Sequence, residues 1–139
     1  MQGREFLTVA REMARGAAEA HWRAAASRAY YALLLEVRDA MTAWGISRPV
    51  PSQVHQLVRR RLFTSSDPGA KRVAITLNDL RESRVRADYE TEVPHEFTAA
   101  AGGQRAVQWA TDALKLFDAI AADGNRRNSI AAVIKAVLP

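Results

Sequence analysis

One stretch, residues 18–44, constrains the fold more than any other part of the sequence. Its apolar residues recur at intervals of three and four, so they line one side of a helix. These residues are Trp22, Ala26, Tyr30, Leu33, Val37, Met41 and Trp44. Tyr31, Leu34 and Leu35 add apolar surface on a second side. Because a helix that is apolar on two sides is covered by neighbours on both, the stretch predicts the central helix of a bundle.

The composition is typical of one all-α domain. A chain of 139 residues is long enough for a core of several helices and too short for two ordinary domains. Alanine, leucine, arginine and glutamate dominate, and β-branched runs are scarce. We therefore expect an up-and-down helical bundle of four to five main helices plus short extra helices, in a single domain over residues 1–139.

Three features of the sequence indicate the cellular compartment of the protein. It contains no cysteine, which excludes disulfides, thiolate metal sites and a catalytic thiol, and which fits a reducing cytoplasm. Residues 1–15 alternate charged with apolar side chains and do not form a signal peptide. No window approaches the roughly 18 apolar residues that a membrane span needs. We expect a cytoplasmic protein without a membrane-bound part.

Glycine and proline divide the first half of the chain. A helix over residues 6–14 should end at Gly16, and Gly45 should close the central helix. Residues 46–51 contain two prolines and are expected to form a loop. Ser52 is the expected N-cap of a short basic helix. The inward side chains of that helix are Val54, Leu57, Val58 and Leu62.

The second half predicts three more helices. Asp67 before Pro68 is typical of an N-cap with proline at the first helical position, and the helix should run to about residue 89, with Pro94 ending any remainder. The next helix has Gly102 and Gly103 either just before its start or in its first turns. Its inward residues are Val107, Ala110, Leu114, Phe117 and Ala121. The domain core then covers about residues 6–121, and a last helix over about residues 126–138 extends it.

The charge pattern favours phosphate-bearing or acidic partners. The net charge is +5, and the arginines gather in short runs. The run Arg59, Arg60 and Arg61 has two readings: a solvated helix face, or a contact with an RNA backbone. Tyr30 and Tyr31 fit packing at the core and at a helix junction better than a platform for stacked bases.

Arg84 interrupts an apolar stripe on the helix that Asp67 begins. The stripe is formed by Val73, Leu77, Leu80, Arg84 and Ala87. A guanidinium there is costly to desolvate unless it is paired or faces a cleft. Asp88 lies four residues on and can pair with it. Two readings stay open: a structural ion pair at the edge of the core, or a phosphate clamp at a junction.

Two motifs together resemble the HEPN family of small helical bundles. They are the run SRAYYA at residues 27–32 and the run RVRADY at residues 84–89, and the similarity spans about residues 6–120. The resemblance implies a bundle of four or five helices that forms a homodimer. It also implies a metal-independent ribonuclease, often a toxin paired with a nucleotidyltransferase-type antitoxin, although other members have lost catalysis.

The catalytic motif of that family fits this sequence only in part. It has an arginine, four to six arbitrary residues and a histidine, commonly with an acid five positions before the arginine. Arg84 matches the arginine and Asp79 the acid, but Tyr89 stands where the histidine would first be allowed. A tyrosine, with a pKa of about 10, is a poor base at neutral pH, whereas a histidine at about 6.5 suits proton transfer.

The three histidines do not repair this motif. The literal spacing occurs between Arg15 and His21 and between Arg48 and His55, but the first crosses Gly16 and the second crosses the proline-containing loop. We interpret both as chance matches. His21, His55 and His95 are too scattered for a metal site and fit surface or capping positions.

Two functions of different classes follow. The first is an RNA-targeting, ribonuclease-type toxin component of a toxin–antitoxin or defence system, with a degenerate motif, acting as a homodimer without metal or cofactor. Its candidate catalytic residues are Arg84, Tyr89, Asp88 and Asp79, and its candidate RNA-binding residues are Arg59, Arg60, Arg61, Arg81 and Arg86. The alternative is a non-catalytic interaction module that binds a nucleotidyltransferase partner or a nucleotide. A purely structural bundle subunit would require Arg84 to be buried in an ion pair within the chain.

Overall fold

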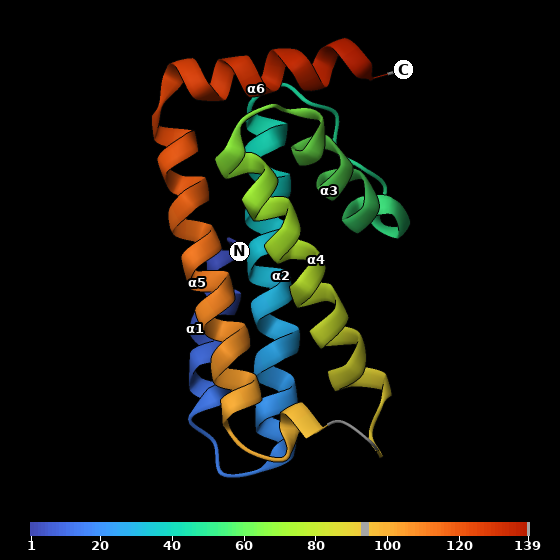
Figure 1. Cartoon of the computed structure of the whole chain (residues 1–139), viewed down its shortest axis with the longest axis vertical. Coiled ribbons are helices and arrows are strands. Elements are labelled where there is room, and N and C mark those ends of the chain that lie inside the picture. Colours follow the sequence, from blue (N-terminus) through green and yellow to red (C-terminus); the bar gives the residue numbers. More distant parts are fainter. Residues whose placement is uncertain (93–94, 139) are drawn as a thin grey trace.

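The computed structural model describes residues 1–92 and 95–138, and its elements are helical (Figure 1). No strand occurs among these residues, which confirms the all-α prediction. The α-helices are α1 (Arg4–Ala14), α2 (Glu19–Ala43), α3 (Val54–Thr64), α4 (Pro68–Tyr89), α5 (Ala101–Ala122) and α6 (Gly124–Val137). Two 3-10 turns, Pro51–Gln53 and His95–Phe97, precede α3 and α5. None of the described helices is both long and apolar enough to cross a membrane.

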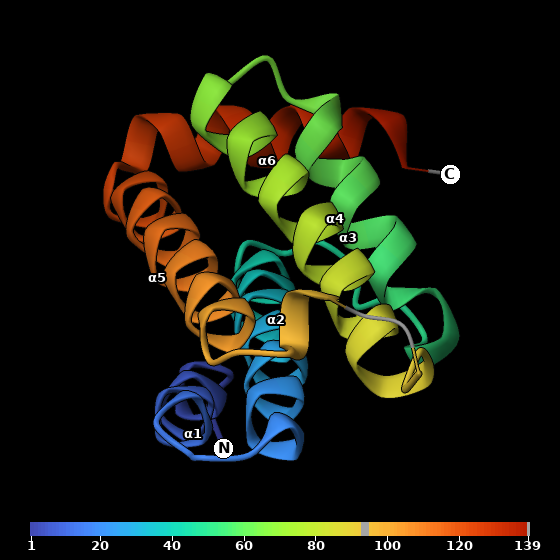
Figure 2. The ribbon, with the colours of Figure 1, turned by 60° about the horizontal axis from the view of Figure 1, so that its bottom comes forward.

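The central position predicted for residues 18–44 is confirmed by α2. It packs against α1, α4 and α5, and its contact with α3 is smaller (Figure 2). Leu33, Leu34 and Val37 are fully or almost fully buried. An apolar face of α2 without cover would favour the homodimer that the family resemblance implies. Helices of the same chain cover α2, so its packing gives no support to a homodimer, and dimerisation stays a prediction.

Helix ends follow the local signals closely at two places. After α2, Gly45 has a φ of +85°, which favours glycine, and its N–H bonds Thr42 O while Ile46 N–H bonds Met41 O. At the start of α4 the Asp67 side chain accepts a hydrogen bond from Ala70 N–H at 3.1 Å. Ser52 is not the N-cap of α3: it lies in the 3-10 turn, and α3 begins after Gln53.

The two glycines at the start of α5 lie inside the helix and are buried. A Cβ atom on Gly102 would lie 1.8 Å from Glu96 O, and one on Gly103 would lie 2.9 Å from Trp22 O. The glycines therefore allow α5 to approach α2 and the preceding turn more closely than any residue with a side chain would. Pro94, the predicted end of the segment after α4, lies outside the described residues.

The last helix, α6, runs across one end of the bundle rather than along it (Figure 1). It begins at Gly124, slightly earlier than predicted, because the Asp123 side chain accepts hydrogen bonds from the N–H groups of Asn125 and Arg126. Its inward side chains, Ile130, Ala131 and Ile134, are buried in the same core as the other helices. Arg126 fixes α6 to the start of α4 through two contacts of 3.0 Å with the Asp67 carboxylate.

Candidate functional site

Arg84 lies at the edge of the core beside two aromatic rings. Its Nε atom is 2.8 Å from Asp88 Oδ2, which is the pairing that the spacing allowed. Its guanidinium carbon is 5.4 Å from the ring centroid of Tyr31 and 5.6 Å from that of Tyr89, within the range of cation–π attraction. The Arg84 side chain is 23% exposed, so it is only partly buried in its ion pair.

The pairing leaves hydrogen-bonding capacity at Arg84 unused. Although Nε lies close to Asp88, no hydrogen bond of good geometry forms, and this buried nitrogen has no partner among the described residues. The Nε atom of Arg59 on α3 is buried and unpartnered in the same way. A ligand cannot reach these buried Nε atoms, but the terminal Nη groups of Arg84 and Arg59 form no hydrogen bond with the described residues and can bind an anion.

The two runs that carry the family resemblance meet in space. Ser27 of α2 donates a hydrogen bond to Asp88 of α4 at 3.4 Å. Tyr31, one turn further along α2, lies beside Arg84. Asp88 is therefore held from two helices, and the junction of α2 with α4 is where the predicted clamp residues gather.

A tyrosine–histidine pair extends this cluster to α3. The hydroxyl of Tyr30 and Nδ1 of His55 share a hydrogen bond of 3.1 Å, and the ring of Tyr30 packs edge-on against Tyr31. Burial raises the pKa of Tyr30 to about 12, against the opposing charges of Arg81 and Arg84. Burial, with the charges of Arg81 and Arg59, lowers the pKa of His55 from 6.5 to about 4. Both groups are therefore neutral at pH 7.

Five side chains on α2, α3 and α4 form what we call the arginine–tyrosine surface: Tyr31, Arg59, Arg81, Arg84 and Tyr89. Arg81 is exposed, and Arg59 is partly buried. Tyr89 is 70% exposed, so its ring is open to a ligand. Asp88 is the carboxylate paired with Arg84 there.

Three predicted site residues do not contribute to the arginine–tyrosine surface, because they point away from it or bind other groups of the chain. Asp79 is exposed, and five residues of helix turn it about 140° away from Arg84 around α4. Arg86 is paired with Glu96. Arg61 is only 6% exposed and donates a hydrogen bond of 2.7 Å to Ser47 O, so it supports the loop after α2 and is not free to contact RNA. Arg60 is exposed and stays a candidate.

The sequence analysis did not predict that His55 forms a hydrogen bond with Tyr30 beside the candidate site. The arginine motif that ends at His55 crosses a loop, and it plays no part in the contact of His55 with Tyr30. One signal was present: His55 adjoins Val54 and precedes Val58 by three residues, which places it on the inward side of α3.

This arrangement suits binding better than proton transfer. Several guanidinium groups and two accessible or half-accessible rings can hold phosphates and bases. A histidine whose pKa is about 4 is a weak base, and its Nδ1 is already bonded to Tyr30. Among the described residues no group of three or more His, Asp or Glu side chains is placed to hold a metal ion.

Comparisons with known proteins give no relative from which a function could be carried over. The chain matches no protein-family model, no curated protein and no solved structure. The function is therefore inferred from the contacts and charges of the chain itself.

Proposed function

We propose that this chain is an RNA-binding helical domain of the HEPN type, which holds single-stranded RNA on the arginine–tyrosine surface. One observation carries the proposal: the Arg84 guanidinium lies over the rings of Tyr31 and Tyr89, and the exposed Arg81 precedes it by one turn of α4. Guanidinium groups recognise phosphates, and an exposed tyrosine ring stacks on a base whatever its identity.

Little RNA cleavage is expected near pH 7. Efficient cleavage needs a group that exchanges protons at this pH. Tyr89 is exposed, and His55 is neutral and bonded to Tyr30. We therefore propose a degenerate ribonuclease whose binding surface is kept, acting in the cytoplasm as the toxin-like component beside a nucleotidyltransferase-type antitoxin.

A binding experiment tests the surface. Fluorescence anisotropy with a labelled single-stranded RNA compares the parent protein with Arg81→Gln, since Arg81 is exposed and has no ion pair among the described residues. The expected result is weaker binding and a salt dependence whose logarithmic slope falls by about 0.7 for each phosphate that the variant no longer neutralises. Tyr89→Ala should weaken binding by roughly 5- to 150-fold, which corresponds to one stacked base.

Arg72→Gln is the matched control. Arg72 is an exposed arginine of the same helix, nine residues before Arg81 and therefore about 180° away around α4. Removing its charge should change RNA binding little. Equally weakened binding in Arg72→Gln and Arg81→Gln would show that RNA responds only to the overall charge, and the proposed surface would be wrong.

A cleavage assay separates the degenerate ribonuclease from an active one. The parent protein, in EDTA at pH 7, should cut RNA slowly or not at all. Tyr89→His restores the family motif, and a gain of metal-independent cleavage supports the assignment of the site. If instead the parent protein cuts RNA and Tyr89→Phe abolishes cutting while RNA binding remains, the tyrosine hydroxyl takes part in catalysis and the degenerate reading is wrong.

The second candidate function is an interaction module that holds a partner protein. It is favoured by a groove between α4 and α5 in which the half-buried Trp109 lies beside Leu116, whose side chain is 41% exposed. Exposed apolar surface of this kind occurs at protein interfaces. A parent protein that binds no RNA but co-purifies with a nucleotidyltransferase-type partner, and loses it in Leu116→Ser, would favour this module over the RNA-binding domain.

A further inference from the structure

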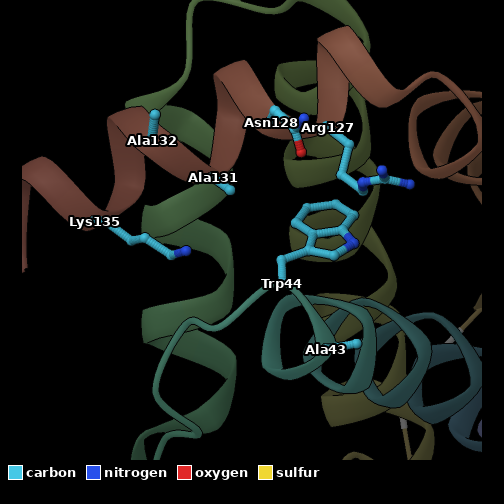
Figure 3. A pocket seen from close by; sticks show the side chains of 7 residues that line it. All are labelled: Ala43, Trp44, Arg127, Asn128, Ala131, Ala132 and Lys135. Carbon is cyan, nitrogen blue, oxygen red and sulfur yellow. The ribbon is translucent and has the colours of Figure 1, made fainter.

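A cavity of about 730 Å³ lies between the end of α2 and one face of α6 (Figure 3). These two elements meet at the opposite end of the bundle from the C-terminal end of α4 (Figure 1). Its volume is within the range of small-molecule sites. The side chains that line it are Ala43, Trp44, Arg127, Asn128, Ala131, Ala132 and Lys135. None of them belongs to the arginine–tyrosine surface.

Trp44 is held in this cavity by the turn that closes α2. It is the residue just before Gly45, and the two hydrogen bonds of that turn fix its backbone. Its indole ring stacks on Phe117, with ring centroids 5.6 Å apart and an angle of 22° between the planes. In Figure 3 the ring lies between the side chains of Lys135 and Arg127. The indole N–H has no hydrogen-bond acceptor among the described residues.

The cavity carries positive charge that the surrounding side chains do not neutralise. Lys135 and Arg127 both line it, and no carboxylate does. Neither cation forms an ion pair within residues 1–92 and 95–138. Arg127 uses Nη1 to bond Ala121 O, which leaves its Nη2 group free to bond a ligand. Asn128, between them on the lining, adds a side-chain amide that can donate and accept.

A purely structural role explains only part of this arrangement. Lys135 lies over Gly45 at the end of α2, a helix without a basic residue in its last turn. The positive charge of Lys135 there is attracted to the negative end of the α2 dipole and stabilises the helix. That role needs neither the stacked indole nor a second cation. The cavity combines an aromatic ring, an amide and two cations. A ligand with a flat ring could stack on the indole, and its anionic group could bind a cation.

We propose that this cavity binds a nucleotide, with the base against Trp44 on the side of Arg127 and the phosphate on the side of Lys135. Indole and guanidinium planes stack on any base, and the Lys135 ammonium holds a phosphate by charge-assisted hydrogen bonds. The ligand is either a free mononucleotide or the terminal nucleotide of an RNA chain, since both present the same base and phosphate. The site does not depend on the RNA-binding function proposed above, because it shares no residue with that surface.

The indole N–H signals in a two-dimensional nitrogen–proton NMR spectrum test the site directly. The chain has three tryptophans, and the Trp22 N–H is bonded to Gly16 O, away from the cavity. Titration with adenosine monophosphate should shift the Trp44 signal saturably and leave the Trp22 signal in place. Inorganic phosphate and adenosine, tested separately, should each bind at least about tenfold more weakly, because each makes only part of the contacts.

Variants that keep the fold identify the residues. Lys135 is exposed, so Lys135→Gln should fold normally and bind adenosine monophosphate about tenfold more weakly, and Lys135→Arg should restore binding. Lys115→Gln removes an exposed lysine of α5 and is the matched control. Trp44→Phe assigns the signal and should weaken binding, with circular dichroism confirming the helical content.

The outcomes are distinct. No saturable shift of the Trp44 signal at up to about 10 mM adenosine monophosphate or phosphorylated RNA overturns the proposal, and so does binding that Lys135→Gln leaves unchanged. If a short RNA with a terminal phosphate shifts the signal at lower concentration than the mononucleotide, the ligand is an RNA end; the reverse order identifies a free nucleotide. The Arg81→Gln variant should bind adenosine monophosphate like the parent, so a failure of the RNA-binding surface is recognised separately.

Discussion

Replacing Gly102 by alanine measures how closely α5 approaches the turn before it. The added Cβ would lie 1.8 Å from Glu96 O, and an ordinary contact begins at 3.4 Å, so the turn must move by about 1.6 Å. Glu96 is held by Ser83, Arg86 and Arg105, and the adjacent Phe97 is completely buried. The displacement therefore disturbs both a polar cluster and the core.

The expected magnitude follows from two opposing terms. Overpacking of this kind costs about 1–3 kcal/mol, while exchange of glycine for alanine within a helix gains up to about 1 kcal/mol. With the full gain, Gly102→Ala should therefore lower the free energy of unfolding by up to about 2 kcal/mol, and Tm by up to roughly 7 °C. Urea denaturation followed by circular dichroism measures the first quantity, and thermal melts measure the second.

Gly124 provides the control. It is the first residue of α6, and a Cβ there would meet Arg127 Nη2 at 3.6 Å, an ordinary contact. Gly124→Ala should leave the stability unchanged or raise it by up to about 1 kcal/mol. If Gly102→Ala proves as stable as Gly124→Ala, the close approach of α5 to Glu96 is wrong.

Three further predictions address the core, the acid range and assembly. Leu33→Ala should cost about 2–5 kcal/mol because Leu33 is completely buried, while the exposed Arg28→Ala should cost much less; equal destabilisation in urea would contradict the burial of α2. The folded protein keeps His55 neutral down to a pKa of about 4, whereas the unfolded chain protonates it at about 6.5, so stability should fall as pH drops through this window. Melts of His55→Gln should show a weaker dependence there, and an unchanged dependence would exclude His55 as its source. Sedimentation at micromolar concentration should show a homodimer, and a species of 15.3 kDa alone would exclude it.

Much of the fold was predictable because its signals are local. The spacing of apolar residues in the range 18–44 predicts α2, and Gly45 predicts the turn that ends it. The pair Asp67 and Pro68 predicts the start of α4. The sequence does not decide whether Gly102 precedes α5 or lies inside it, since glycine disfavours a helix interior. Only the approach of Glu96, six residues earlier, shows why glycine is required there. Helix propensity at that position is outweighed by a contact that the sequence does not display.

The candidate site shows the same division between local and distant contacts. The Arg84 and Asp88 pair lies within one helix turn and could be predicted from spacing. The contact between Tyr30 and His55 joins residues 25 positions apart, and it depends on how α3 packs against α2. Arg61 looked like a surface residue of a basic run, but the loop after α2 folds back so that Ser47 covers it.

The position of α2 also has a consequence for synthesis of the chain. Its neighbour α1 precedes it and can pack as soon as α2 has formed, but α4 and α5 cover its other sides and are made later. A growing chain therefore carries apolar surface of α2, including Leu33 and Val37, without its cover until α5 has left the ribosome. Because domains begin to fold from the N-terminal part during translation, chains that stall before Ala101 should be the aggregation-prone species of this protein.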